Sequence, residues 1–297
     1  MIEEKCNSSA RDVPGPRNRP RIGWLINLRI QGLAYRLGKG QYLYVGFPRL
    51  LVKRPKGQDL PLELGQVDGS QFFRFNFEGT DVRMFFDPEL QHDARQVILE
   101  TFSSDVYHID VTGRDVVDIG ANIGDTAIYF ALRGAKRVIA FEPYPSAYQV
   151  AKLNVEANSM GNKVTMLNEG IGMPSTLTID PTFKVKVFSQ LRVSEAGVRV
   201  RLRSLKDLVR SFGLREAVLK LDCEGCEYGA IMGTSPETLA CFKTILMEYH
   251  YGSKGLVRRL RKAGFSVQAF YRGLVYYVQR DSANPFREKG YLLATRK

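Results

Sequence analysis

The sequence predicts an α/β fold in which a mostly parallel sheet is connected by crossover helices. From Arg114 onward, short apolar runs alternate with stretches of helical periodicity, a pattern typical of such sheets. Residues 116–125 are an apolar, β-branched run that ends in an acid and opens into a glycine loop and a helix. A second apolar run, 137–142, also ends in an acid. Strand, glycine loop and helix together can present backbone N–H groups to a nucleotide-like ligand.

The glycine loop has the spacing Gly120-x-x-x-Gly124. A pyrophosphate-binding loop would read Gly-x-Gly-x-x-Gly, and a P-loop would continue into Gly-Lys-Ser/Thr, so both classes are excluded. Asp118, just before the loop, is unfavourable for a phosphate. It suits a ligand with a cationic or amine-bearing head, such as S-adenosylmethionine.

Glu142 ends the second strand and lies 22 residues after Gly120. This is close to the roughly 20-residue offset at which a strand-end carboxylate meets a ribose diol. The alternative is a solvated acid at the start of the helix that begins near Ser146. The two strands, the glycine loop and Glu142 together favour a bound nucleoside.

The 297 residues provide ample length for a buried core, and 44% of them are hydrophobic. No run approaches the ~18 apolar residues of a membrane span. The first residues lack a basic segment followed by an apolar core, so we expect no secretory signal and a cytoplasmic protein. The four cysteines do not predict a disulfide framework.

The net charge of +12 is unevenly distributed, with twelve lysines and arginines among residues 1–60. Such a basic region can contact nucleic acid, an anionic membrane or an acidic substrate, or it can simply be solvated. Residues 1–20 are expected to form a flexible basic arm. Residues 22–37 have helical periodicity, and this helix either packs on its own domain or contacts a membrane peripherally.

Residues 21–110 are expected to form an N-terminal α+β subdomain, and residues 111–297 the main domain. In the subdomain we expect β structure over 41–53 and over 71–86, with a turn at 78–81, and a helix over 89–103. In the main domain the expected strands are 115–119, 137–142, 163–168, 217–222 and 243–249. The expected helices are 124–133, 145–158, 204–211, 225–232 and 253–263.

An insertion separates the third and fourth of these strands. Its extended pieces, 177–179, 184–188 and 198–202, predict a β-hairpin near the site. After Gly264, the segments 265–270, 274–278 and 291–294 are expected to complete the sheet as strands that are at least partly antiparallel.

A second group of polar residues follows the strand at 217–222. Asp222, Glu224 and Glu227 lie within six residues, and ligands of open parallel sheets bind outside the carboxyl ends of the strands. These acids can bind a cationic head, hold a hydroxyl or act as a base, or they are solvated acids at a helix N-terminus. His250 follows the next strand at the same level, as a base or as a structural hydrogen-bonding residue.

Cys223 and Cys226 invite a metal or redox interpretation. Zinc sites usually need a second ligand pair, and the chain has neither another Cys-x-x-Cys nor a His-x-x-x-His. A thioredoxin-type pair would not have acids inside the motif, since they raise the thiol pKa. We therefore expect two small, semi-buried residues and no metal.

These segments resemble the FkbM family of S-adenosylmethionine-dependent methyltransferases. The resemblance rests on Val117–Gly124, Ala140–Pro143, the run Leu219–Glu227 and Glu248–His250. It covers residues 115–250 well, and the Lys-x-Asp-x-Glu-Gly-x-Glu run is its specific part. Residues 1–70 match no family that we can name, and the two cysteines depart from the pattern.

The resemblance implies a class I methyltransferase fold, Rossmann-like, with strand order 3-2-1-4-5-7-6, the seventh strand antiparallel, and here an N-terminal extension. It implies S-adenosyl-L-methionine as cofactor and a sugar, glycolipid or polyketide-type hydroxyl as acceptor. Asp222 and Glu224 would face the methyl-transfer site, and Glu142 would bind the ribose. The methionine part of the cofactor would be held by Asp118, Gly120, Asn122 and Gly124. The adenine would be bordered by Glu169, Gly170 and Ile171.

A hydroxyl nucleophile gains from a base that removes its proton during methyl transfer. We expect Glu224 or His250 to be that base and Asp222 to position the acceptor. An alternative is an RNA-modifying methyltransferase that uses the basic N-terminal region, although the Asn/Asp-Pro-Pro-Tyr signature of amine methylation is absent. A non-catalytic nucleoside-binding or membrane-peripheral protein is a third class. The glycine spacing argues against a dehydrogenase.

Overall fold

The computed structural model describes residues 43–45, 51–53, 60–104, 106–185, 193–276 and 286–296. Its centre is a seven-stranded sheet with the order β8-β7-β6-β12-β13-β15-β14. The strands are β6 (Asp115–Ile119), β7 (Arg137–Phe141), β8 (Val164–Leu167), β12 (Ala217–Leu221), β13 (Phe242–Tyr249), β14 (Ser266–Tyr276) and β15 (Phe286–Thr295). Only β15 runs antiparallel to both of its neighbours. Counted along the chain, this is the order 3-2-1-4-5-7-6, which confirms the predicted fold.

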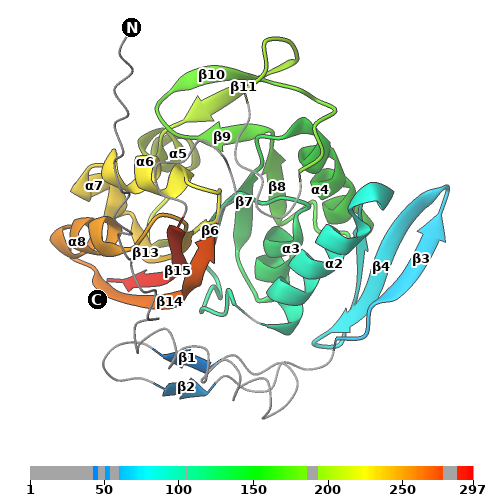
Figure 1. Ribbon diagram of the computed structural model, residues 1–297, viewed down its shortest axis with the longest axis horizontal. Helices are drawn as coiled ribbons and strands as arrows, with labels where there is room; N and C mark the ends of the chain where they lie inside the picture. Colours follow the sequence, from blue (N-terminus) through cyan, green and yellow to red (C-terminus); the bar gives the residue numbers. More distant parts are fainter. Residues whose placement is uncertain are drawn as a thin grey trace, which may run out of the picture.

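Alternation along the strands gives the sheet two apolar faces. In β6, Val116 joins one cluster of buried side chains, whereas Val117 and Ile119 join the other. Because successive side chains point to opposite faces, both faces need a cover. The first face packs against α3 (Asp125–Leu132) and α4 (Pro145–Ala157). The second packs against α5 (Leu205–Phe212), α6 (Cys226–Met232), α7 (Pro236–Leu239) and α8 (Lys254–Lys262), which lie on the opposite side in Figure 1.

A smaller antiparallel sheet precedes the central one. It contains β3 (Glu63–Val67), β4 (Ser70–Phe77) and β5 (Thr80–Phe85), and the β3–β4 hairpin extends away from α5–α8 in Figure 1. The predicted turn between β4 and β5 is confirmed, with Glu78 and Gly79 in the left-handed region (φ 48° and 85°). The predicted helix at 89–103 comprises η1 (Pro88–Leu90), α2 (Gln91–Ile98) and the π-helical turn η2 (Leu99–Ser103).

Part of the N-terminal prediction falls outside the described residues, namely the arm at 1–20 and the helix at 22–37 with its membrane contact. Within 41–53, β1 (Leu43–Val45) pairs with β2 (Leu51–Lys53) in an antiparallel manner. In the described part of the chain, no helix is long and apolar enough to cross a membrane.

The insertion forms a separate three-stranded sheet. β10 (Ser175–Ile179) and β11 (Val198–Arg203) make the predicted antiparallel hairpin, and β11 also pairs in parallel with β9 (Glu169–Ile171). The middle expected piece, 184–188, is irregular at its first two residues, and its other three residues lie outside the described part of the chain. In Figure 1 this sheet lies at one end of the central sheet, above β7 and β8.

One prediction near the C-terminal side was wrong. The segments 265–270 and 274–278 were expected to be separate strands, but β14 runs without a break from Ser266 to Tyr276. Gly273 resembles a turn in sequence, whereas in the structure the register shifts between Tyr271 and Gly273 and pairing with β15 continues. A bulge of this kind absorbs an extra residue without ending the strand.

Candidate active site

The glycine loop follows β6 and reaches the end of β12. Gly120 has φ 78°, and a Cβ built there would lie 1.9 Å from the carbonyl oxygen of Asp222. Only glycine therefore allows the two strand ends to approach this closely. The backbone N–H of Asp222 in turn donates to the carbonyl of Ile119 at 3.0 Å. The first and fourth parallel strands are thus neighbours, and their polar ends share one crevice.

Glu142 is buried between the glycine loop and the start of α4. Its Oε2 accepts the backbone N–H of Asn122 at 2.8 Å, and its Oε1 accepts that of Tyr144 at 3.0 Å. Burial raises the pKa of Glu142 to about 7, and the two N–H groups only partly oppose this shift. The backbone thus fixes a carboxyl group that changes charge near neutral pH.

A pocket opens at the carboxyl ends of β6, β7, β12 and β13. Its wall contains Val97, Glu100, Thr101, Tyr107, Gly120, Asn122, Asp125, Thr126, Glu142, Pro143, Tyr144, Val185, Lys220, Asp222, Cys223, Glu224, Glu248 and Lys289. The predicted residues Gly120, Asn122, Glu142, Asp222 and Glu224 are brought together there.

Asp118 does not lie on this wall. Its fully buried carboxylate is 3.0 Å from Lys220 Nζ and accepts a hydrogen bond from Thr126 Oγ1 at 2.6 Å. Lys220 also donates to the carbonyl of Gly120 at 2.8 Å. Asp118 therefore stabilises the glycine loop indirectly, through its ion pair with Lys220. Gly124 is likewise off the wall, at the N-cap of α3 with φ 84°.

The segment 169–171 also lies away from the pocket wall. Glu169 pairs with Arg203 at 3.4 Å, Gly170 lies under Leu202, and Ile171 is buried in the apolar cluster of the second face. On this side the wall is formed by Pro143, Tyr144 and Val185. Val185 comes from the insertion, which was expected to lie near the site, but no signal in the sequence singled out this residue.

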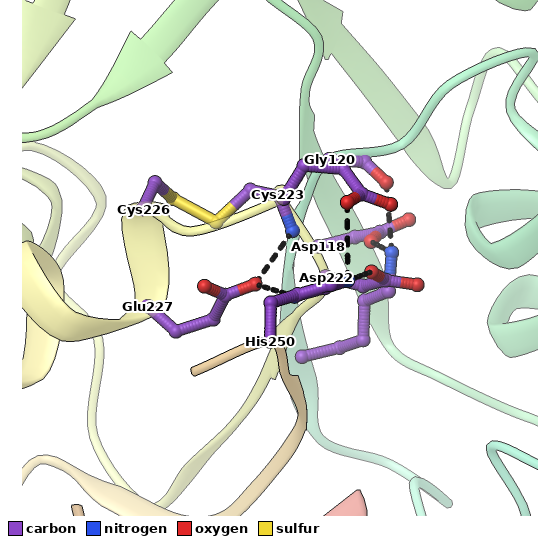
Figure 2. Close-up of a disulfide and its surroundings, with 9 residues drawn as sticks. Asp118, Gly120, Asp222, Cys223, Cys226, Glu227 and His250 are labelled. Atoms are coloured by element: carbon purple, nitrogen blue, oxygen red, sulfur yellow. Dashed lines mark hydrogen bonds and ion pairs between the residues drawn. A yellow bond between two sulfur atoms is a disulfide. The ribbon is translucent and has the colours of Figure 1, made fainter. Parts of the chain in front are cut away.

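Asp222, Glu224 and His250 meet at the edge of the pocket. His250 is 2% exposed, and its Nε2 lies 3.3 Å from Glu224 Oε2, 3.7 Å from Glu248 Oε2 and 4.0 Å from Asp222 Oδ1. Its Nδ1 lies 3.0 Å from Oε1 of the buried Glu227, which also accepts the backbone N–H of Cys223 (Figure 2). Glu227 therefore fixes the orientation of the imidazole.

Opposite charges gather in this cluster. Burial alone would raise the pKa of Asp222, but Lys220, His250 and Lys289 together lower it to about 2. Burial alone would lower the pKa of His250, but Glu224 and Glu227 raise it to about 10. The carboxylates of the cluster thus stabilise a positive charge on a group placed between them.

Three cluster partners were not predicted. Tyr107 Oη donates to Asp222 Oδ2 at 2.6 Å, Lys289 Nζ lies 3.2 Å from Glu248 Oε1, and Lys220 carries the ion pair with Asp118. Lys220 had a usable signal, since a lysine inside an otherwise apolar strand needs a buried partner. Tyr107 and Lys289 come from distant parts of the chain, and nothing near them in sequence marks them.

Cys223 and Cys226 are half-buried as expected, but they also form a disulfide, which the sequence did not predict (Figure 2). Their Cα atoms are 5.4 Å apart, within the range of roughly 4.4–6.8 Å that a disulfide requires. The spacing in sequence does not fix this distance, which depends on the turn between them. Within the ring, Glu224 has φ 55° and Gly225 has φ 120°.

The chain is similar in sequence to known methyltransferases. A family model described as the methyltransferase FkbM domain matches residues 118–267. Methyltransferase sdnD of Sordaria araneosa is 26% identical over 193 residues, which cover 52% of this chain and 74% of that protein. The ribosomal protein L11 methyltransferase of Carboxydothermus hydrogenoformans is 34% identical over 68 residues, which cover 23% of this chain and 22% of that protein.

Among solved structures, the precorrin-6y C5,15-methyltransferase of Geobacter metallireducens is similar with a TM-score of 0.38 and 14% identity, covering 72% of this chain and 94% of that chain. TrmK of M. capricolum, in complex with S-adenosylhomocysteine, has a TM-score of 0.38 and 10% identity, covering 65% of this chain and 66% of that chain.

Proposed function

Since the chain belongs to the FkbM family of methyltransferases, we propose that it methylates a hydroxyl oxygen of a sugar, a glycolipid or a small metabolite. Its cofactor is S-adenosyl-L-methionine. The observation that carries the proposal is the meeting of Asp222, Glu224 and His250 at the pocket that Glu142 and the glycine loop also line. Methylation of a hydroxyl needs a proton acceptor, and this cluster supplies one.

The residues of the pocket fit the cofactor. The carboxyl group of Glu142, held by two backbone N–H groups, can accept hydrogen bonds from a ribose diol. Gly120 and Asn122 line the place for the methionine part, and Asp222 offers negative charge to its cationic groups. Tyr144, stacked on Phe183 with ring centres 5.2 Å apart, gives an apolar surface for the adenine.

The other residues predicted to bind the cofactor lie off the pocket wall. In this proposal they hold the backbone of the site in its conformation. Asp118, with Lys220, holds the carbonyl of Gly120 in place. Gly124 starts α3 in a left-handed conformation. Residues 169–171 support the inserted sheet, whose next segment brings Val185 to the pocket.

When bound, the cofactor supplies a methyl group that its sulfonium makes electrophilic. Glu224 lies on the pocket wall and accepts the proton of the acceptor hydroxyl, whereas His250 lies behind it and orients its carboxylate at 3.3 Å. Asp222, held by Tyr107, positions the acceptor. The contribution of the protein is then mainly alignment and proton removal.

The first test is calorimetric titration of S-adenosylhomocysteine into the full chain. We expect binding that weakens about tenfold or more in Glu142→Ala, because charge-assisted hydrogen bonds are lost. Glu156→Gln, an exposed acid on α4, is the matched control and should bind as the unaltered protein does. Absence of binding to the unaltered protein would overturn the proposed function.

The second test is transfer of a labelled methyl group to a panel of monosaccharides, glycolipids, small hydroxylated metabolites and total RNA. We expect label on a hydroxyl oxygen, and a turnover about 10²–10⁴ lower in Glu224→Gln with unchanged cofactor binding. Label found only in RNA, with uptake that falls steeply with salt, would instead support the RNA-modifying alternative.

A further inference from the structure

The cluster at the edge of the pocket has the composition of a divalent-cation site. One ligand atom each from Asp222, Glu224 and His250 lie within 4.8 Å of one another. Metal–oxygen bonds of about 2.1 Å place neighbouring ligands about 3 Å apart and opposite ligands about 4.2 Å apart. The distances from His250 Nε2, 3.3 Å to Glu224 and 4.0 Å to Asp222, fall inside this range. Small side-chain movements would complete the coordination.

The imidazole provides an independent observation. His250 Nε2 is buried and lies 3.3 Å from Glu224 and 4.0 Å from Asp222, but among the described residues neither contact has the geometry of a hydrogen bond. Leaving a buried polar atom unsatisfied costs free energy, so such an atom indicates a missing partner. A cation between the three side chains would be that partner.

The arrangement behind the imidazole is also that of a metal ligand. A metal-bound histidine almost always donates its other ring N–H to a carboxylate or carbonyl, which fixes the tautomer and turns the ring. Here Nδ1 of His250 lies 3.0 Å from Oε1 of Glu227, which is fully buried. A cation bound at Nε2 would take the place of the proton there, and the remaining proton would stay on Nδ1, donated to Glu227.

The cluster contains more carboxylates than cationic side chains. In the described part of the chain, Lys220 is paired with Asp118 and Lys289 with Glu248. Three further carboxylates, those of Asp222, Glu224 and Glu227, surround the single imidazole of His250. Buried carboxylates in excess of the cations near them are stabilised by a bound metal ion.

We propose that Asp222, Glu224 and His250 bind a divalent cation of the Mn²⁺ class, with Glu227 orienting the imidazole. Two carboxylates and one imidazole suit Mn²⁺, because carboxylates favour Mn²⁺ and Mg²⁺ and imidazole favours the transition metals. Asp222 and Glu224 line the pocket, so a cation held between them would border it.

A cation at this position would bind the oxygen of the acceptor hydroxyl and lower its pKa, and Glu224 Oε1 could then take the proton more readily. This role rests on the proposed function. Binding of the cation itself does not, so the two can fail separately.

The test is titration of MnCl₂ into the full chain, prepared without a polyhistidine tag and treated with a chelator, and monitored by electron paramagnetic resonance. The sharp spectrum of aqueous Mn²⁺ disappears when the ion binds. We expect one Mn²⁺ per chain, and binding at least tenfold weaker in Glu224→Gln and in His250→Ala. Glu156→Gln is the matched control, because it removes an exposed carboxylate that does not line the pocket.

S-adenosylhomocysteine binding is measured on each variant, and its retention shows that the pocket is folded. Absence of Mn²⁺ binding, or equal binding by the unaltered protein and Glu224→Gln, would overturn the cation site even if the cofactor product binds. Mn²⁺ binding that depends on Glu224 and His250 supports the site even if no methyl transfer is found. Displacement of Mn²⁺ by an equal concentration of Mg²⁺ would overturn its assignment to the Mn²⁺ class, because the imidazole ligand favours Mn²⁺ over Mg²⁺.

Discussion

At the scale of single residues, Glu142 combines burial with a ligand-binding position. Two backbone N–H groups hold its oxygens, but the loss of water still raises its pKa to about 7. The group is therefore a carboxylate above neutral pH and a neutral acid below it. A ribose diol donates more strongly to the carboxylate, because charge-assisted hydrogen bonds are the stronger ones.

We expect the affinity for S-adenosylhomocysteine to fall as the pH is lowered from 8 to 6, because Glu142 becomes protonated in this interval. In Glu142→Gln the affinity should be about 10–100-fold lower at pH 8 and nearly independent of pH. Calorimetry at pH 6, 7 and 8 measures this, with Glu169→Gln as the control off the pocket wall. An unchanged pH dependence in Glu142→Gln would assign the titration to another group.

The same pKa shift affects the stability of the ligand-free protein with the opposite sign. The folded state binds a proton at Glu142 more tightly than the unfolded chain, whose ordinary pKa is 4.5. The free energy of unfolding therefore decreases as the pH rises from about 4.5 to about 7. Asp125, whose pKa burial also raises to about 7, contributes in the same direction.

The residues of the cluster could be predicted from the sequence, because parallel strands bring their carboxyl ends to one edge of the sheet. Asp222, Glu224 and His250 were predicted in this way. The direction of a side chain at a strand end was not predictable, and Asp118 points below the loop toward Lys220. The disulfide also depends on the turn between its cysteines, which the spacing alone does not define.

At the scale of elements, Asn154 of α4 and Asn158 at its C-cap bind the small N-terminal sheet to this helix. Asn154 is fully buried, and its side chain bonds to the N–H and the carbonyl of Phe85 and to the carbonyl of Ile123. Asn158, one turn further, bonds in the same way to the N–H and the carbonyl of the exposed residue Arg83. The pair offers a matched comparison.

We expect Asn154→Ala to lower the free energy of unfolding by about 3 kcal/mol or more, because several buried backbone groups lose their partners. Asn158→Ala should cost about 1 kcal/mol or less, because water replaces the lost hydrogen bonds. Urea denaturation of both variants measures the difference. Equal losses of unfolding free energy in the two variants would show that burial does not increase the contribution of the Asn154 hydrogen bonds to stability.

Elements with a long, regular pattern were predicted well, whereas short ones were not. The buried strands β6, β7, β12 and β13 carry continuous apolar runs between turn residues. The four-residue helix α7 and the strand β3, whose side chains are mostly exposed, lack such a pattern. β3 depends on its pairing with β4, whereas α7 depends on the Ser235 cap and on Pro236 at its first position.

At the scale of the whole molecule, one apolar cluster spans the predicted subdomain boundary at residue 110. Phe75 and Phe77 of β4 contact Phe102 at ring distances of 4.9 and 5.1 Å, and Phe77 contacts Tyr129 of α3 at 5.6 Å. The same cluster continues to Val116 in the central sheet. Residues that share a core are expected to unfold together.

We therefore expect β4, β5 and the central strands β6 and β7 to lose their amide protection in the same cooperative opening. Hydrogen exchange followed by mass spectrometry at increasing urea measures the opening free energy of each segment. β3, with its mostly exposed side chains, is the internal comparison and should exchange earlier. If β4 and β5 opened at a clearly lower free energy than β6 and β7, they would be a separate unit.

The position of β15 between β13 and β14 has a consequence for synthesis on the ribosome. β13 gains its outer neighbour only when residues 286–295 have been translated, and Lys289 of this strand is the partner of Glu248 at the pocket. At about 5–20 residues per second, the nascent chain spends seconds with the edge of β13 uncovered. An uncovered strand edge is a template for pairing with other chains, so this interval is where we expect chaperones to act.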